Sequence, residues 1–220
     1  MRKYSGKKVC IICEGYEELD YIETLKNKAV FSDKYDFITV NAKSINTIIA
    51  RYQEKYQSDS YSLVLIFCDT DKGPSEKYKE IKQKINEFHE ADVADDIVIF
   101  GNPCTMQIIL SHFAEIKLTS QSKSVNSEFI EKYTGIKNYK ATDEQRKELF
   151  NHIRRSNYET MKENVKKLST NDEDISSTNI LKFIEKFESD DDSWIDEINN
   201  RLWRRRTNGR NRKHFIGKIF

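Results

Sequence analysis

The chain has 220 residues, which is enough for one α/β domain with a helical addition and for a substantial buried core. Charged residues make up 33% of it, as in helix-rich folded proteins, whereas a net charge of +1 gives no argument for a nucleic-acid partner. No apolar run approaches the ~18 residues of a membrane span and the N-terminus lacks an apolar signal segment, so we expect a cytoplasmic protein without membrane contact.

Strand and helix patterns alternate along the first half of the sequence. The strands are expected over 7–13, 35–40, 63–68 and 96–100, and the helices that follow them begin near residues 17, 45, 75 and 106. Alternation at this spacing predicts an α/β fold with a doubly wound, mainly parallel sheet of about four strands and right-handed crossovers.

The pattern changes beyond residue 114, where we expect helices and no further strand. Helical segments are expected over 129–133, 144–168 and 180–187. Ser176, Ser177 and Thr178 are candidate caps for the last of these helices. We therefore divide the chain into an α/β domain over 1–115 and a helical region with a basic tail over 116–220.

Three carboxylates follow the first and third expected strands. Glu14 comes directly after the first strand, and Asp69 and Asp71 come after the third. Residues two apart in an extended segment point the same way, so Asp69 and Asp71 can face one site while Thr70 faces elsewhere. The carboxyl ends of neighbouring parallel strands meet at one rim of an open sheet, where ligands bind. All three acids are therefore expected at one site.

Convergent carboxylates are the ligands that hard divalent ions such as Mg²⁺ or Mn²⁺ prefer, together with water and substrate phosphate. Such an ion would polarise a phosphoryl oxygen and activate water. Asp69 and Asp71 are the candidate ligands, and Glu14 is either a further ligand or the general acid or base. The alternative is that these acids belong to ordinary solvated turns.

Other polar residues have simpler interpretations. Glu17 and Glu18 fit the first turn of a helix, where the macrodipole favours acids, with Glu18 also a candidate near the metal. His112 lies in an apolar helix and is expected to pack in the core, whereas His89 lies in a charged helix and is expected in solvent.

The C-terminal segment from Arg201 onward has many basic residues and no acid. Arginines interspersed with aromatic residues are typical of nucleic-acid contacts, which combine phosphate pairing with base stacking. A solvated chain end is the alternative. The candidate nucleic-acid-binding residues are Lys72, Trp203, Arg204, Arg205, Arg206, Arg210, Arg212 and Lys213.

Two parts of the sequence resemble a known domain. CEGYEELDYIETL, from Cys13 to Leu25, followed downstream by FCDTDKG, resembles the TOPRIM domain shared by topoisomerases, primases and OLD-type nucleases. The lone glutamate after the first strand and the later Asp-x-Asp are that domain's signature. The resemblance implies that Asp69 and Asp71 bind Mg²⁺ and that Glu14 acts in phosphodiester chemistry.

A narrower resemblance comes from NPCTMQIILSHF, over 102–113, and SSTNILKFIEKF, over 176–187. Both are similar to motifs of the RloB-like proteins, small TOPRIM proteins of bacterial phage-defence and abortive-infection operons that are usually encoded beside an ABC-type ATPase. This resemblance implies a Mg²⁺-dependent endonuclease that cuts RNA, with tRNA as one candidate, or DNA. It would act as the toxic effector of a defence system with a partner ATPase, and self-association is left open.

One departure from that family supports an alternative function. The family commonly has a Phe-Glu pair after Asn-Pro-Cys, where this chain has Thr105 and Met106. The alternative is a catalytically degenerate TOPRIM module that binds nucleic acid or a protein partner without cutting. A receiver-like phosphoacceptor is a third hypothesis, but it requires an acidic pair after the first strand, where Glu14 is followed by Gly15.

Overall fold

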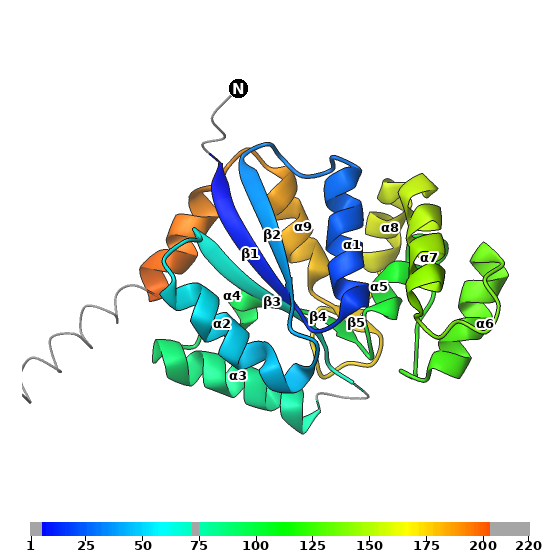
Figure 1. Cartoon of the computed structure of the whole chain (residues 1–220), viewed down its shortest axis with the longest axis horizontal. Helices are drawn as coiled ribbons and strands as arrows, with labels where there is room; N and C mark the ends of the chain where they lie inside the picture. Colours follow the sequence, from blue (N-terminus) through cyan, green and yellow to red (C-terminus); the bar gives the residue numbers. More distant parts are fainter. Residues whose placement is uncertain (1–5, 72–74, 203–220) are drawn as a thin grey trace, which may run out of the picture.

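Five strands, β1 (Lys7–Cys13), β2 (Tyr35–Asn41), β3 (Leu63–Asp69), β4 (Val98–Asn102) and β5 (Ser177–Thr178), form one sheet at the centre of the molecule (Figure 1). The computed structural model describes residues 6–71 and 75–202. The strand order is β2-β1-β3-β4-β5. β1 pairs in parallel with β2 and β3, and β3 pairs in parallel with β4. The predicted mainly parallel α/β sheet is confirmed.

No strand was expected beyond residue 114, and this is wrong, because β5 lies there. β5 pairs antiparallel with the end of β4 through Ser177 and Thr178, which the sequence suggested as helix caps. A two-residue polar strand has no hydrophobic period that could identify it. The helix after β5 instead has Asn179 at its N-cap position, although the Thr178 hydroxyl accepts a hydrogen bond of 3.2 Å from the Ile180 amide.

The helices follow the predicted order with two differences. The single helix expected over 144–168 is broken at Ser156, because the Asn157 side chain caps a new helix, and residues 96–97, expected as strand, end a short helix. They are α1 (Tyr16–Asn27), η1 (Ile45–Thr47), α2 (Ile48–Gln57), α3 (Glu76–His89), α4 (Ala94–Ile97), α5 (Met106–Leu110), α6 (Lys123–Thr134), α7 (Asp143–Arg155), α8 (Tyr158–Val165) and α9 (Ile180–Glu188), with a further helical stretch over 193–202. In the described part of the chain, no helix combines the length and apolar composition that a membrane span requires.

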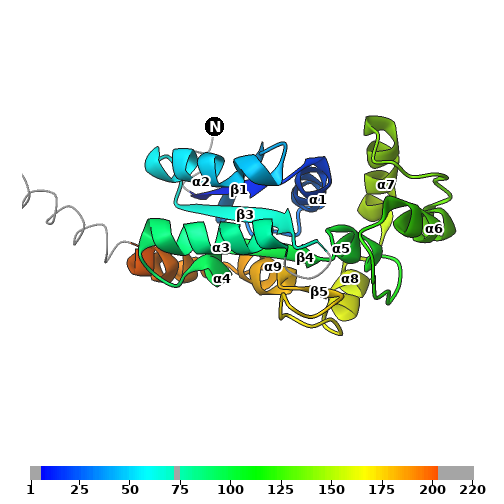
Figure 2. The same ribbon diagram turned by 90° about the horizontal axis from the view of Figure 1, so that it is seen from below.

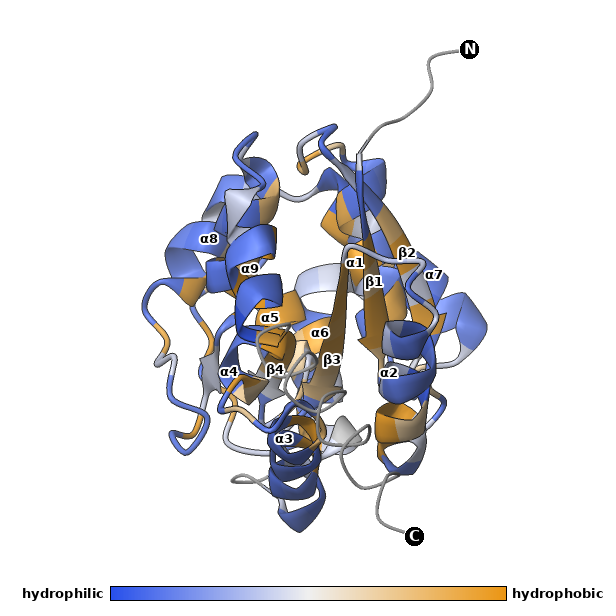
Figure 3. Cartoon of the chain, turned by 90° about the vertical axis from the view of Figure 1, so that its left-hand side faces the viewer, coloured by the Kyte–Doolittle hydropathy of each residue, from blue (hydrophilic) through white to orange (hydrophobic). Residues whose placement is uncertain are grey.

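Helices cover both faces of the sheet. Tyr21 of α1 packs edge-on against Phe67 of β3, with ring centroids 6.5 Å apart, and Tyr78 of α3 packs against Phe100 of β4 at 6.2 Å. Phe100 pairs with Cys68, the neighbour of Phe67, and successive strand residues point to opposite faces. α1 and α3 therefore cover opposite faces, and the apolar strands between them form the core (Figure 3).

The last described residues pack back against the first strands. Phe187 in α9 contacts Phe37 of β2, with ring centroids 4.7 Å apart, and Trp194 Nε1 donates a hydrogen bond of 2.9 Å to the Tyr35 hydroxyl. Residues from both sides of the expected boundary thus share one aromatic cluster. The division into 1–115 and 116–220 stays a prediction. Figures 1 and 2 show α6 and α7 at the end of the molecule toward which β1 and β3 point.

Two histidines test the burial predictions. His112 packs in the core as predicted, with Nε2 3.2 Å from the Tyr21 hydroxyl. His89 was expected in solvent, and this is wrong, because it is buried with Nε2 2.8 Å from the Tyr52 hydroxyl. His89 follows Ile85 by four residues and so shares the buried side of α3.

Candidate functional site

The carboxyl ends of β1 and β3 lie side by side at one rim of the sheet (Figure 1). The chain continues from β1 to β2 on one side and returns to β3 on the other, so this rim is a topological switch point. Glu14 directly follows β1, and its amide donates a hydrogen bond of 2.9 Å to the Phe67 carbonyl. Its Oε2 accepts a bond of 3.1 Å from the Asp69 amide. The two acids expected to meet are therefore adjacent.

Thr105, just before α5, holds the Asp69 carboxylate. Its amide and its hydroxyl donate hydrogen bonds of 2.7 and 2.8 Å to Asp69 Oδ1. Gly101 of β4 makes this approach possible, because a Cβ there would lie 2.9 Å from the backbone of Cys104 and Thr105. Both bonds end on Oδ1, so Oδ2 is the oxygen that remains for a ligand.

Asp71 reaches the site by a different route from the one predicted. β3 ends at Asp69, Thr70 is buried, and Asp71 has φ +61°, in the left-handed region. The extended geometry that would carry Asp69 and Asp71 on one face therefore stops before Asp71, and that argument is wrong. Asp tolerates the left-handed conformation better than most residues, and the resulting turn still brings Asp71 to the same pocket as Asp69.

Glu18 is a buried acid of this site that the sequence assigned mainly to the first turn of a helix. Its Oε2 does accept a hydrogen bond of 2.8 Å from the Gly15 amide, as a capping residue would. Burial, with the nearby charges of Glu17 and Glu14, nevertheless raises the pKa of Glu18 to about 7, against an opposing effect of the Thr105 hydroxyl. We call Glu14, Glu17, Glu18, Asp69 and Asp71 the acid rim.

Burial and mutual repulsion raise the pKa values of Glu14, Glu18 and Asp69. The pKa of Asp69 lies well above its ordinary value because the carboxyl is buried and because Glu18 and Glu14 add negative charge. The pKa of Glu14 is also raised, first by burial and then by the charge of Asp71, while the Asp69 amide and Lys77 act in the opposite direction. A bound cation would relieve this repulsion.

A pocket of about 230 Å³ opens beside the acid rim. Its described lining residues are Glu17, Asp69, Asp71, Cys104, Thr105, Met106, Gln121, Asn126 and Tyr139. The last three come from the segment beyond residue 115, so the helical region closes one side of the site. No motif in that segment identified them in the sequence.

Two of the pocket residues from the helical region, Asn126 and Tyr139, have buried polar side chains. The buried Tyr139 hydroxyl donates a hydrogen bond of 3.0 Å to Glu17 Oε1. Asn126 is 4% exposed, and its Oδ1 has no hydrogen-bond partner among the described residues. Its Nδ2 lies 3.6 Å from Cys104 Sγ. A buried amide oxygen without a partner is rare in folded proteins and is consistent with a site that binds a ligand.

The acid rim offers the oxygen ligands that a divalent cation prefers, but its side chains are not arranged as a complete ligand set. Within the described ranges, no three Asp, Glu, His or Cys side chains converge as ligands of one ion. Mg²⁺, however, is usually held by one or two carboxylates and keeps several waters, which substrate phosphate can replace. Asp69 with Asp71 or Glu14 supplies that number of carboxylates.

The remaining predicted site residues lie outside the described residues. These are Lys72, Trp203, Arg204, Arg205, Arg206, Arg210, Arg212 and Lys213. Their expected contact with nucleic acid stays a prediction.

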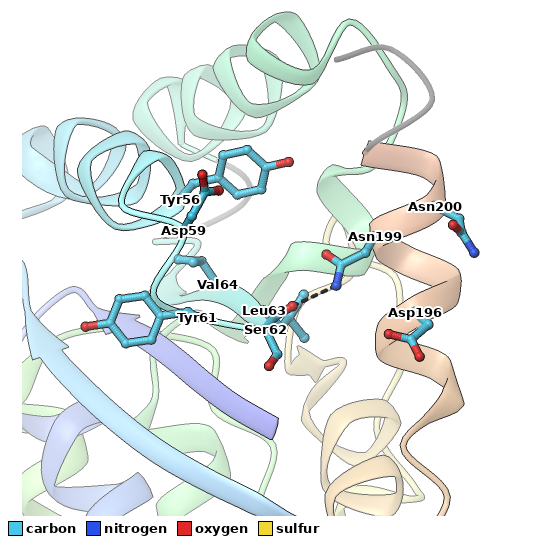
Figure 4. A pocket seen from close by; sticks show the side chains of 9 residues that line it. All are labelled: Tyr56, Asp59, Tyr61, Ser62, Leu63, Val64, Asp196, Asn199 and Asn200. Atoms are coloured by element: carbon cyan, nitrogen blue, oxygen red, sulfur yellow. Dashed lines mark hydrogen bonds between the residues drawn. The ribbon is translucent and has the colours of Figure 1, made fainter. Parts of the chain in front are cut away.

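A second pocket, of about 450 Å³, lies at the other end of β3 (Figure 4). Tyr61, Ser62 and Leu63 line it where β3 begins, together with Asn199 from the last described helical stretch. Asn199 Nδ2 donates a hydrogen bond of 2.7 Å to the Ser62 carbonyl. The length of β3 separates this pocket from the acid rim, so it is not part of the same site.

Comparisons with protein-family models, with curated proteins and with solved structures found no match for this chain.

Proposed function

We propose that this chain is a metal-dependent nuclease that hydrolyses phosphodiester bonds of RNA or DNA at the acid rim. The observation that carries the proposal is the pairing of Glu14 and Asp69 at the switch point of the sheet, where both carboxyls have raised pKa values. Perturbed acids in a cleft are candidates for catalytic groups and metal ligands.

Three acids of the rim, Glu14, Asp69 and Asp71, have proposed roles. Asp69, oriented by Thr105, and Asp71 hold Mg²⁺ or Mn²⁺. The ion, when bound, polarises a phosphoryl oxygen of the substrate and activates water. Glu14 either completes the ligand set or transfers a proton, and burial raises its pKa above the ordinary value of a glutamate.

The biological setting follows from the resemblance to RloB-like TOPRIM proteins. It gives the nuclease the role of toxic effector in an anti-phage defence system, with an ABC-type ATPase as partner and tRNA as one candidate substrate. The basic residues from Arg204 to Lys213, together with Lys72 and Trp203, would contact nucleic acid. The proposal leaves open whether the chain also forms a homo-oligomer.

A second candidate is a TOPRIM module that binds nucleic acid or a protein without cutting. The observation that favours it is Met106, which is buried and lines the pocket where the related family carries an acid. The presence of all three acids, Glu14, Asp69 and Asp71, favours the nuclease function. A phosphoacceptor role has less support, since no lysine occurs among the described residues that line the pocket.

Cleavage assays separate these functions. The purified chain is incubated with Mg²⁺ or Mn²⁺ and fluorescently labelled single-stranded RNA, single-stranded DNA and duplexes. We expect cleavage of at least one substrate, and a loss of roughly a hundredfold or more in Asp69→Asn. Asp33→Asn is the matched control, because Asp33 is an exposed acid next to β2 at the amino ends of the strands.

The outcomes point to different conclusions. Cleavage that is equal in Asp69→Asn and in the unchanged chain would place the chemistry away from the acid rim. Nucleic-acid binding without cleavage in any metal would favour the second candidate. Loss of activity in Asp33→Asn as well would indicate a general loss of folding, which thermal unfolding of the same samples checks.

A further inference from the structure

Tyr16 stands out among the described tyrosines because it is exposed and directly precedes Glu17 of the acid rim. It is 55% exposed, although it is the first residue of α1 and lies two positions after Glu14. The other described tyrosines are buried or half-buried. Single exposed apolar residues are common on protein surfaces, so the position and support of this ring decide whether it has a function.

Arg146 of α7 supports the ring. Its guanidinium carbon lies 4.7 Å from the centre of the Tyr16 ring. The guanidinium itself is fixed by hydrogen bonds of 2.9 Å to Asp20, 2.8 Å to the Ala141 carbonyl and 3.1 Å to Asp143. Arg146 is only 9% exposed, so a buried, anchored cation lies against one face of the ring while Tyr16 as a residue stays exposed.

Positive charges lie close to the same rim. Lys77 in the first turn of α3 is exposed and near enough to lower the proton affinity of Glu14. Lys43 is exposed just after β2, and the Ala42 amide next to it bonds to the Cys13 carbonyl at 2.8 Å. Neither lysine forms an ion pair with another described residue. A polyanion can therefore approach the rim alongside its acids.

We propose that Tyr16 is a stacking platform for an unpaired nucleobase of single-stranded nucleic acid whose phosphate lies at the acid rim. This inference rests on the proposed nuclease function and names its substrate class. A base inside a duplex is already stacked on both sides and must be unstacked before it can reach the ring. Single strands, or loops within folded RNA, therefore bind better than duplexes.

The test measures binding and not cleavage, so that it is independent of the catalytic step. Labelled single-stranded oligonucleotides of RNA and DNA are titrated with Glu14→Gln protein in Mg²⁺ and in chelator, by fluorescence anisotropy. A fluorescent purine analogue in the strand reports stacking by quenching. In this background we compare Tyr16 with Tyr16→Ala, Tyr16→Phe and Tyr16→Trp, and use Ile175→Ala, at a residue that is 57% exposed, as the control.

Tyr16→Ala should weaken single-strand binding by roughly fivefold to a hundredfold and remove the quenching, because stacking on an aromatic side chain is lost. Tyr16→Phe and Tyr16→Trp should retain both signals, and Ile175→Ala should change neither. Binding and quenching that persist in Tyr16→Ala would overturn the stacking proposal and leave the nuclease proposal intact. Absence of nucleic-acid binding in every variant and also in the unchanged chain would overturn both proposals.

Thermal unfolding guards against a purely structural role of the ring. Tyr16→Ala loses the contact with Arg146, so a small decrease in melting temperature is expected. If binding falls equally in Tyr16→Phe and Tyr16→Ala, the hydroxyl and not the stacking face is responsible, and the proposal fails.

Discussion

The two ends of the parallel sheet differ in how their polar groups are satisfied. At the amino end, Lys7 Nζ pairs with Asp196 at 2.9 Å, and Asn199 bonds to the Ser62 carbonyl at 2.7 Å. At the carboxyl end, Glu14 and Asp69 come together with no ion pair to any described cation, and burial raises the pKa of both. These amino-end groups have partners within the chain, whereas Glu14 and Asp69 have no cationic partner among the described residues.

This difference is the reason for placing the proposed site at the carboxyl end. Groups that satisfy one another contribute to stability and leave nothing for a ligand. Buried acids that repel one another destabilise the folded chain, and they favour the binding of a cation that removes the repulsion. The contrast makes specific predictions for substitutions at each end.

The largest expected effect is on activity at the carboxyl end. Glu14→Gln should lower cleavage by roughly a hundredfold or more, because it removes a proton-transfer group or a metal ligand. The same change removes negative charge beside Asp69 and should leave the melting temperature unchanged or raise it. Cleavage rates and thermal unfolding of one preparation check both outcomes. A stable Glu14→Gln protein that still cuts would show that the chemistry lies elsewhere.

The acid rim should also make stability depend on pH. The folded-state pKa of Glu18 is about 7 against an ordinary value of 4.5, so the folded chain binds this proton more tightly than the unfolded chain. The stability contributed by this group is full below pH 4.5 and is lost as the pH rises through about 7. The loss is on the order of 3 kcal/mol, since one pKa unit corresponds to about 1.4 kcal/mol.

Glu18→Gln tests this pH dependence and keeps an acceptor for the Gly15 amide. Urea unfolding at pH 5 and pH 8 should show a smaller difference in unfolding free energy for the variant than for the unchanged chain. Added Mg²⁺ at pH 8 should stabilise the unchanged chain. Identical pH profiles would mean that Glu18 is not the group that titrates.

A smaller effect is expected from the residue that holds Asp69. Thr105→Val removes the hydroxyl bond to Asp69 and keeps the amide bond, so cleavage should fall by about tenfold, in line with ~1.5 kcal/mol for a hydrogen bond to a charged group. Thr105→Ser restores the hydroxyl and should restore the activity. A Thr105→Ser protein that stays as impaired as Thr105→Val would indicate a packing effect of the methyl group.

The smallest effect is expected at the amino end. Asp196→Asn breaks an exposed ion pair with Lys7, and such pairs contribute less than about 1 kcal/mol. Cleavage and metal affinity should remain unchanged. Any change in cleavage after Asp196→Asn would contradict the separation of the two ends.

The sequence predicted those residues of the site that directly follow recognisable strands. The apolar run of β3 and the acids around it predicted Asp69, and the parallel topology predicted its meeting with Glu14. Thr105 was not predicted as a partner of Asp69, because it lies 36 residues away and only tertiary packing brings it there. Asn126 and Tyr139 were not predicted for the same reason, because they belong to the helical region and only tertiary packing brings them to the pocket.

Two incorrect predictions have local causes. His89 was expected in solvent from its charged neighbours, but its helical spacing from Ile81 and Ile85 decides its burial. Asp71 was expected to share an extended strand with Asp69, but the chain turns there through a left-handed residue. Spacing along the helix predicts the burial of His89, and the turn-forming aspartates predict the turn at Asp71, but the left-handed conformation itself is visible only in the structure.

The central claim is that the acid rim binds a divalent cation, and calorimetric titration tests it most directly. Mn²⁺ and Mg²⁺ are titrated into the unchanged chain, into Asp69→Asn/Asp71→Asn, and into the Asp33→Asn control, at a pH where the acids are ionised. We predict saturable binding in the unchanged chain and the control, and loss of that binding in the double variant. Equal metal affinity in all three proteins would contradict the assignment of the site.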